Sequence, residues 1–223
     1  MEISFALLCQ SPLFQGVTPQ ELGQMLPCLG AQQRRASRGQ LLFHAGQPAR
    51  WVGLVLEGAV HIVQEDYYGS RSIVATIQPP ELFGEAFACA GVQVLPVSAE
   101  AAQDCRVLLL DVQRVIATCS DACAFHQRLV GNLLGIVARK NLTLTKKLAL
   151  VSKKTTREKL MAYLMEEARR AGSPAFTLPY NRQTLADYLG VDRSAMSAEL
   201  SKLRRAGVLD CKGRQVRLHK PEP

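Results

Sequence analysis

Two predicted helices and the glycine between them, within residues 181–205, constrain the fold of this chain more than any other segment. Asn181 and Asp192 each precede a run of residues with helical periodicity, so each can cap the helix that follows it. Gly190 lies between the two helices, where a tight turn needs a residue that tolerates a positive φ. With the small Ala186 at the point where the helices cross, this arrangement predicts a helix-turn-helix.

A β-hairpin is expected directly after these helices. Its strands are Val208-Leu209-Asp210-Cys211 and Gln215-Val216-Arg217-Leu218, and Lys212-Gly213 lies at the turn between them. A hairpin at this place in the sequence would form the wing of a winged helix-turn-helix.

The positive charge of the chain is concentrated in the same region. The net charge is +8, but residues 1–137 hold 8 Lys+Arg and 11 Asp+Glu, whereas residues 138–223 hold 19 and 8. The two parts therefore carry −3 and +11, and every lysine lies at or after Lys140. This distribution predicts that only the C-terminal part meets a polyanion. A solvated basic face is the alternative, and the helix-turn-helix in the same region favours nucleic acid.

The exposed side of the second helix carries side chains suited to base edges. Arg193, Ser194 and Ser197 lie within its first five residues, the end that enters the major groove in this motif. An arginine there can donate two hydrogen bonds to guanine, and a serine can donate or accept one. Double-stranded DNA is therefore the predicted partner. Phosphate contacts are expected from Arg182, Gln183, Thr184, Lys202, Arg204 and Arg205.

The N-terminal part has the pattern of a β-protein. Short hydrophobic runs separated by turn residues extend over residues 39–111, with Val60-His61-Ile62-Val63 as one example and Pro79-Pro80 ending another. Many strands at this spacing, without intervening helices, predict an antiparallel sandwich or barrel. Before the strands, Thr18 and Glu21 match a capping box and predict a short helix.

One long helix is predicted between about residues 121 and 151, where hydrophobic residues recur every three or four positions. Its narrow apolar seam consists of Leu133, Val137, Leu144, Leu148 and Val151. Asn141 interrupts the seam and is able either to fix the register of two helices or to face water. A partner helix would cover such a seam, so we predict a homodimer along this helix. Packing of the helix on its own sandwich is the alternative.

Four segments taken together resemble the CRP/FNR family of bacterial transcription regulators. They are Leu54-Val55-Leu56-Glu57-Gly58, Phe83-Gly84-Glu85, the long helix and residues 182–193. The resemblance, which covers most of the chain, implies an N-terminal cyclic-nucleotide-binding-type jelly roll. It also implies a dimer that binds a two-fold-symmetric DNA site and acts on RNA polymerase. In this family, DNA affinity changes when the N-terminal domain senses a signal.

The expected fold class is α+β. It combines an N-terminal antiparallel jelly-roll β-sandwich, a long dimerisation helix and a C-terminal winged helix-turn-helix. We expect an effector-sensing domain over residues 1–120, the dimerisation helix over 121–151 and the DNA-binding domain over 152–223. The boundary is placed near Ser152 because Thr155 can begin a new helix with a capping box.

The second helix of the motif departs from the family at three positions. Ala198 stands where an arginine is frequent, Glu199 where an apolar residue is usual, and Ser194 where a glutamate is frequent. Arg193 matches the position that commonly contacts a base. The DNA sequence bound by this chain is therefore expected to differ from those of the best-known members.

Ordinary control by cyclic AMP is not expected. Members that bind the nucleotide have Phe-Gly-Glu followed by Pro-Arg-Ser/Thr-Ala, and the glutamate takes the ribose hydroxyl. Here Pro96-Val97-Ser98-Ala99 aligns with the second part, so Val97 replaces the phosphate-binding arginine. A buried phosphate would lose charge-assisted hydrogen bonds worth about 1.5–3 kcal/mol each. The effector stays open, and the resemblance places its candidate site at Gly84, Glu85, Ala86, Val97, Ser98 and Thr145.

The seven cysteines do not form a recognisable metal or disulfide pattern. No C-x-x-C occurs, and Cys9 with Cys28 does not supply the close N-terminal cluster of the iron–sulfur branch of the family. Cys119 and Cys123 could share one helical face, but two thiolates do not complete a metal site. A redox or metal-sensing regulator of the same fold therefore remains an alternative.

Haem sensing and catalysis find little support in the residues. His44, His61 and His126 are available as haem ligands, but nothing in the sequence distinguishes one of them, so a haem-sensing regulator of the same fold stays open. Jelly-roll metalloenzymes need clustered histidine and carboxylate ligands, and no His-x-His pair occurs here. Neither a catalytic nor a metal site is predicted, and we expect that the protein is not an enzyme.

Length and composition set the outer limits. A chain of 223 residues with 48% hydrophobic and 21% charged residues fits one large or two modest globular domains. No apolar run approaches the roughly 20 residues that a membrane-spanning helix needs. A cytoplasmic protein without membrane contact is expected.

Overall fold

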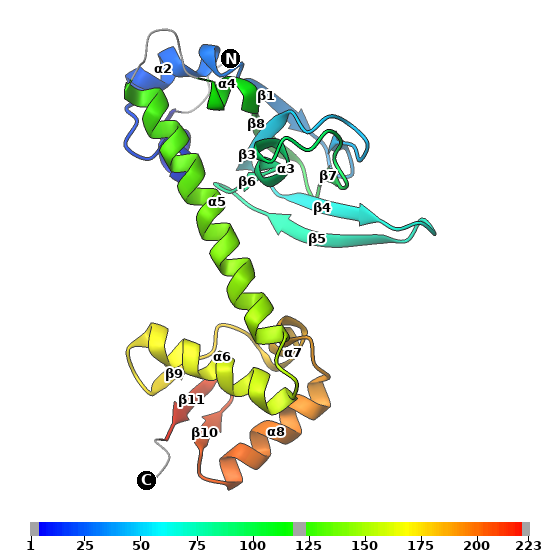
Figure 1. Ribbon diagram of the computed structural model, residues 1–223, viewed down its shortest axis with the longest axis vertical. Coiled ribbons are helices and arrows are strands. Elements are labelled where there is room, and N and C mark those ends of the chain that lie inside the picture. Colours follow the sequence, from blue (N-terminus) through cyan, green and yellow to red (C-terminus); the bar gives the residue numbers. More distant parts are fainter. Residues whose placement is uncertain (1–4, 118–123, 220–223) are drawn as a thin grey trace. The chain divides into compact units, whose positions relative to one another are not determined.

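The structure, a computed structural model, describes residues 5–117 and 124–219 of the chain. These residues form two compact units, one ending at Lys140 and the other beginning at Asn141, and each is described by itself (Figure 1). The division lies inside helix α5 (Ala124–Val151), whereas the sequence placed a domain boundary near Ser152. The domain limits 1–120, 121–151 and 152–223 stay a prediction.

Two four-stranded antiparallel sheets form the centre of the first unit (Figure 1). The first sheet has the order β1-β8-β3-β6, with β1 Gln32–Ala36, β8 Cys105–Asp111, β3 Trp51–Glu57 and β6 Leu82–Phe83. The second has the order β2-β7-β4-β5, with β2 Leu41–Phe43, β7 Ser98–Ala101, β4 Val60–Glu65 and β5 Arg71–Ile77. One hydrophobic cluster combines side chains of both sheets, so the sheets pack face to face as the predicted sandwich.

The first sheet is buried on both faces. Val55 of β3 belongs to the core between the sheets, whereas its neighbours Leu54 and Leu56 belong to a second cluster on the other side. Short helices and the first part of α5 cover that side. These helices are α1 Phe5–Cys9, η1 Pro12–Phe14, α2 Pro19–Cys28 and α4 Val112–Ile116. The capping box of Thr18 and Glu21 at the start of α2 is confirmed.

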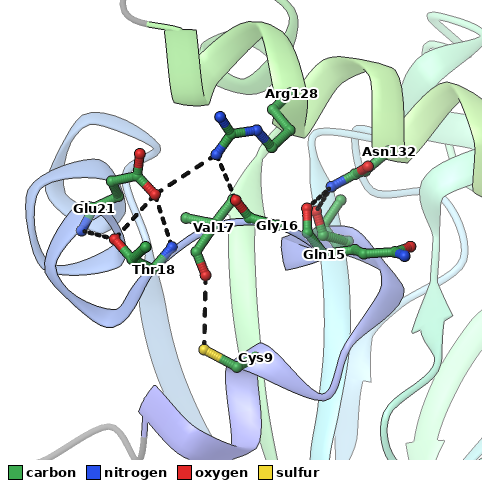
Figure 2. Close-up of polar contacts among 9 residues, drawn as sticks. Cys9, Gln15, Gly16, Val17, Thr18, Glu21, Arg128 and Asn132 are labelled. Atoms are coloured by element: carbon green, nitrogen blue, oxygen red, sulfur yellow. Dashed lines mark hydrogen bonds and ion pairs between the residues drawn. The ribbon is translucent and has the colours of Figure 1, made fainter.

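Polar contacts hold the first part of α5 to the segment before α2 (Figure 2). Asn132 Nδ2 donates hydrogen bonds to the carbonyl oxygens of Leu13 and Gln15, at 3.0 and 2.9 Å. Arg128 Nη1 donates to the carbonyl oxygen of Gly16 and lies 3.7 Å from Oε2 of Glu21. This part of α5 is therefore an integral part of the first unit.

The predicted seam of the long helix has two different environments. Leu133 is 4% exposed and Val137 packs against the same cluster, so the sandwich of the same chain covers both. Leu144 and Leu148, by contrast, are 65% and 64% exposed. Cys119, Cys123 and the predicted first residues of the helix lie outside the described residues. Self-packing thus accounts for only part of the seam.

The second unit packs three helices on a small sheet. After the end of α5 come α6 Thr156–Ala171, β9 Ala175–Thr177, α7 Arg182–Leu189, α8 Arg193–Arg205, β10 Leu209–Lys212 and β11 Gln215–Leu218. The strands have the order β10-β11-β9, and β10 and β11 form the predicted hairpin. Thr155 and Glu158 form the predicted capping box of α6. Buried leucines of all three helices, together with Val216 of β11, form one core.

Candidate functional site

Helices α7 and α8 form the helix-turn-helix that the sequence predicts. The Asn181 side chain accepts a hydrogen bond from the backbone N–H of Thr184 at 2.9 Å, and Asp192 accepts one from that of Ala195 at 2.9 Å. Gly190 has φ +60°, the left-handed conformation that ends α7 and turns the chain. Ala186, Leu189 and the other inward residues of the motif are buried in the core of the unit. Local residue chemistry therefore fixes the relative position of the two helices.

Arg193 is the first residue of α8, and its side chain is exposed. Over the described part of the chain, its guanidinium takes part in no hydrogen bond or ion pair. A free guanidinium at the start of the second helix can form the bidentate contact with guanine described for this motif.

The hydroxyl groups of the two serines near Arg193 already donate hydrogen bonds within the protein. Ser194 Oγ donates to the carboxylate of Asp192, and Ser197 Oγ donates to the carbonyl oxygen of Arg193 at 2.8 Å. The remaining lone pairs can accept hydrogen bonds from amino groups of bases. The hydrogen bonds from Ser194 Oγ and from the Ala195 N–H lower the pKa of Asp192.

Glu199 connects α8 to α6. Its carboxylate lies 3.6 Å from Arg157 Nη1 and 3.4 Å from Lys202 Nζ, and its side chain is only 13% exposed. This pairing gives a physical reason for a glutamate at a position where an apolar residue is usual. Lys202 itself is 62% exposed, so it can still approach a phosphate.

Gln183 and Thr184 of α7 lie at the exposed start of the motif. Thr184 Oγ1 donates to Asn181 Oδ1 at 3.1 Å, and Gln183 Nε2 donates to Asp187 Oδ1 at 2.9 Å. Both side chains are exposed, as is Arg204 near the end of α8. Arg182 differs from this group, because its guanidinium is bound to the wing.

Gly84 and Glu85 of the candidate effector site have structural roles in the first unit. Gly84 has φ +79° and precedes α3 (Glu85–Cys89), and a Cβ there would lie 3.0 Å from the carbonyl oxygen of Trp51. Glu85 is 4% exposed, and its Oε1 lies 2.7 Å from Lys140 Nζ. Lys140 Nζ also donates to the carbonyl oxygen of Leu82 at 2.8 Å. The sequence analysis did not identify Lys140 as part of this site.

The remaining candidate effector residues are distributed differently. Ser98 Oγ accepts a hydrogen bond from the N–H of Ala45 at 3.0 Å, and Val97 beside it is partly exposed. Ala86 is exposed on α3. Thr145 is exposed and belongs to the second unit. The first unit therefore contains every member of the candidate effector site except Thr145.

Two of the three candidate haem-ligand histidines have partners within the first unit. His126 is 7% exposed with Nε2 2.8 Å from the carbonyl oxygen of Val115, and His61 Nδ1 lies 3.0 Å from Thr76 Oγ1. Within residues 5–117 and 124–219, no group of three or more His, Cys, Asp or Glu residues is placed to hold a metal ion. None of the helices in these ranges is long and apolar enough to span a membrane.

Comparison with known proteins finds relatives for both the N-terminal sandwich and the C-terminal helix-turn-helix. A family model described as cyclic nucleotide-binding domain matches residues 33–121, and one described as Crp-like helix-turn-helix domain matches residues 158–223. The cyclic AMP receptor protein of Thermus thermophilus is 28% identical over 202 residues, 89% of this chain and 88% of that protein. The transcriptional activator protein FnrA of Stutzerimonas stutzeri is 25% identical over 190 residues, 83% of this chain and 75% of that protein.

A solved structure shows the same likeness. The crystal structure of the Thermus thermophilus catabolite activator protein matches with a TM-score of 0.53 and 27% identity, covering 94% of each chain. Fold and site together define a DNA-binding transcription regulator with a cyclic nucleotide-binding-type domain, and not an enzyme. The chain belongs to the CRP/FNR family of transcription regulators.

Proposed function

We propose that this regulator binds a two-fold-symmetric DNA site as a homodimer, with the start of each α8 in a major groove. The free, exposed guanidinium of Arg193 at the first position of α8 is the observation that carries this proposal. Arg193 would contact guanine, and Ser194 and Ser197 would accept hydrogen bonds from base amino groups. The two half-sites would lie about one helical turn, or ~34 Å, apart. Phosphate contacts are assigned to Gln183, Thr184, Lys202 and Arg204.

Dimerisation through α5 is supported by its exposed leucines. Leu134, Asn141 and Leu148 follow one another at intervals of seven residues, the spacing that aligns side chains along one seam of a coiled coil. Leu134 and Leu148 are 69% and 64% exposed in the single chain. A second copy of α5 would remove these side chains from water and place the two Asn141 amides opposite each other.

The proposed signal is not ordinary cyclic AMP. The phosphate of that nucleotide would meet Val97 where nucleotide-binding members supply an arginine. The carboxylate that would take the ribose hydroxyl is that of Glu85, which already has an ammonium partner in Lys140. A ligand that uses Glu85 must therefore compete with a charge-assisted hydrogen bond inside the protein. Because the proposed DNA target lies in the cytoplasm, we assign the protein to that compartment, with RNA polymerase as its protein partner.

Repeated selection from a randomised duplex pool, with the full-length protein, tests the proposed function. We expect recovery of a sequence with two inverted half-sites, bound more tightly than random competitor DNA by a factor of about 10³ or more. A variant with Arg193→Ala and Ser197→Ala should lose most of this preference while retaining binding to random DNA. Recovery of no preferred sequence by the wild-type protein would contradict the proposal.

A further inference from the structure

Arg182 is the first residue of α7, but its guanidinium lies against the wing. Nη2 donates to Sγ of Cys211 at 2.6 Å and to the carbonyl oxygen of Gly213 at 3.2 Å. Nη1 is buried and has no hydrogen-bond partner in the described part of the chain. The side chain thus connects the first turn of the helix-turn-helix to the turn between β10 and β11.

This geometry leaves little of the guanidinium for DNA. An η nitrogen carries two hydrogens, and the two acceptors in the wing account for both of those on Nη2. Nη1 is inaccessible to solvent, so a phosphate oxygen cannot reach it unless the side chain or its surroundings move. Arg182 is in this respect the opposite of Arg193, whose guanidinium is exposed and free.

The wing turn is held from two sides. The N–H of Leu178 donates to the carbonyl oxygen of Arg214 at 2.8 Å, and Arg182 binds the carbonyl oxygen of Gly213. Gly213 has φ +61°, and its neighbours Lys212 and Arg214 are exposed. Because the backbone at Gly213 is held in place, the side chains of Lys212 and Arg214 project from the wing in defined directions.

We propose that Arg182 is a positioning residue that acts on DNA through the wing cations Lys212 and Arg214, without contacting a phosphate itself. The proposal rests on the proposed DNA-binding function. An arginine suits this role because its guanidinium is planar. One of its nitrogens can donate to two acceptors while the other packs beside them. A lysine keeps the charge but not this geometry.

The first test is the salt dependence of affinity for the best duplex selected with the wild-type protein. Arg182→Lys should weaken binding of this duplex about tenfold and lower the slope of log K against log salt by about 1 to 2, because phosphate contacts of the wing are lost. A phosphate-binding role predicts an unchanged slope, since the charge at position 182 is retained. Arg169→Lys is the matched control, because it makes the same exchange at an exposed arginine of α6 to which no DNA contact is assigned, so it should leave affinity and slope unchanged.

A double-mutant comparison tests whether Arg182 acts through the wing. Lys212→Ala and Arg214→Ala together should weaken binding of the same duplex about tenfold in the wild-type background. In the Arg182→Lys background, the same pair should have an effect of less than about twofold, because the wing cations no longer reach DNA. Equal effects in the two backgrounds would overturn the proposal.

A second variant covers the case in which Arg182→Lys does not fold, as judged by circular dichroism. Cys211→Ala removes the sulfur that accepts from Arg182 and donates to the carbonyl oxygen of Gly213 at 3.6 Å, but leaves the bond from Arg182 to that carbonyl, so it should lower affinity and slope in the same direction by a smaller amount. An unchanged affinity and slope in Cys211→Ala would then overturn the proposal. If the wild-type protein prefers no duplex, both this inference and the proposed function fail; if it does but Arg182→Lys behaves as wild type, only this inference fails.

Discussion

Nζ of Lys140 lies 2.7 Å from Oε1 of Glu85, and the carboxylate is buried while the lysine side chain is 43% exposed. A buried carboxylate is stable only with a partner, and the ammonium group supplies both a charge and a hydrogen bond. The same ammonium donates to the carbonyl oxygen of Leu82, which directly precedes the Phe83-Gly84-Glu85 segment. The candidate effector site thus contains an internal cation that binds the carboxylate characteristic of nucleotide-binding members.

Lys140→Met should destabilise the first unit by about 1–3 kcal/mol, because the buried carboxylate of Glu85 loses its charged hydrogen-bond partner. The loss should be smaller than the roughly 3–5 kcal/mol found on breaking fully buried pairs, since Lys140 is partly exposed. Trp51, the single tryptophan of the chain, lies in the first unit, so its fluorescence during urea unfolding reports this effect. Lys140→Arg, which keeps the charge, is the control and should lose much less. Equal stability of Lys140→Met and wild type would show that the ion pair contributes nothing.

Cyclic AMP at millimolar concentration should change neither the melting temperature nor the DNA affinity of the wild-type protein. Val97 offers no cation for the phosphate, and Glu85 is bound by Lys140. A ligand at about 100 times its Kd stabilises a protein by about 2.7 kcal/mol, so binding would be visible in a thermal melt. Val97→Arg is the matched variant, because it restores the phosphate-binding cation and should increase any response. A clear stabilisation of the wild-type protein would contradict the argument from Val97.

The helix-turn-helix was predictable from sequence because its determinants are local. Asn181 and Asp192 accept hydrogen bonds from N–H groups three residues away, and Gly190 adopts the left-handed conformation that its turn requires. The alternation of strands and turns likewise predicted the sandwich, and the structure adds the strand order. Arg193, Ser194 and Ser197 could be chosen because exposure on a short amphipathic helix follows from periodicity.

The contacts that sequence analysis missed join distant parts of the chain. Lys140 and Glu85 are 55 residues apart, and Arg182 and Cys211 are 29 apart. A pattern within one helix cannot show that Arg182 contacts the wing, and charge alone predicts a phosphate contact for it. The seam of α5 posed the same problem, because periodicity does not reveal that the sandwich of the same chain covers Leu133.

Arg193→Ala should cost about 1–3 kcal/mol of binding free energy on the selected duplex and relax specificity at one base position. The reason is that the exposed guanidinium is assigned to a base edge, where it distinguishes guanine from the other bases. Lys202→Ala provides the contrast, because a phosphate contact should weaken all duplexes alike and flatten the salt dependence. Affinities for duplexes with every base at each position would measure the change in specificity, and affinities at several salt concentrations would measure the change in salt dependence. Uniform weakening by Arg193→Ala would place that side chain on a phosphate.

Replacing Leu144 and Leu148 together by glutamate should convert the proposed dimer to a monomer. Both leucines are more than 60% exposed in the single chain, and charged residues in a helical seam would oppose each other across it. Analytical ultracentrifugation measures the outcome directly. Met165→Glu is the control, because Met165 is 59% exposed on α6 and lies outside the seam. A doubly substituted protein that still sediments as a dimer would exclude this part of α5 as the interface.

We predict that the helix-turn-helix is less stable in acid than at neutral pH, because Asp192 loses its charge in acid. Hydrogen bonds from Ser194 Oγ and from the Ala195 N–H hold its pKa below the ordinary value of an aspartate. A carboxyl whose pKa is lower in the folded than in the unfolded chain stabilises the fold at pH values above the unfolded pKa. That stability is lost as the pH falls through the folded pKa.

Asp192→Asn separates this charge effect from capping, because asparagine caps a helix about as well but does not titrate. Thermal unfolding of full-length wild-type and Asp192→Asn proteins, followed by circular dichroism, should show the wild type more stable at neutral pH. The difference should disappear toward strongly acidic pH. Glu21 also has a lowered pKa, caused mainly by its hydrogen bond from the Thr18 N–H, but it is present in both proteins and cancels in the comparison. A difference in stability that is independent of pH would mean that the charge on Asp192 has no part in stabilising α8.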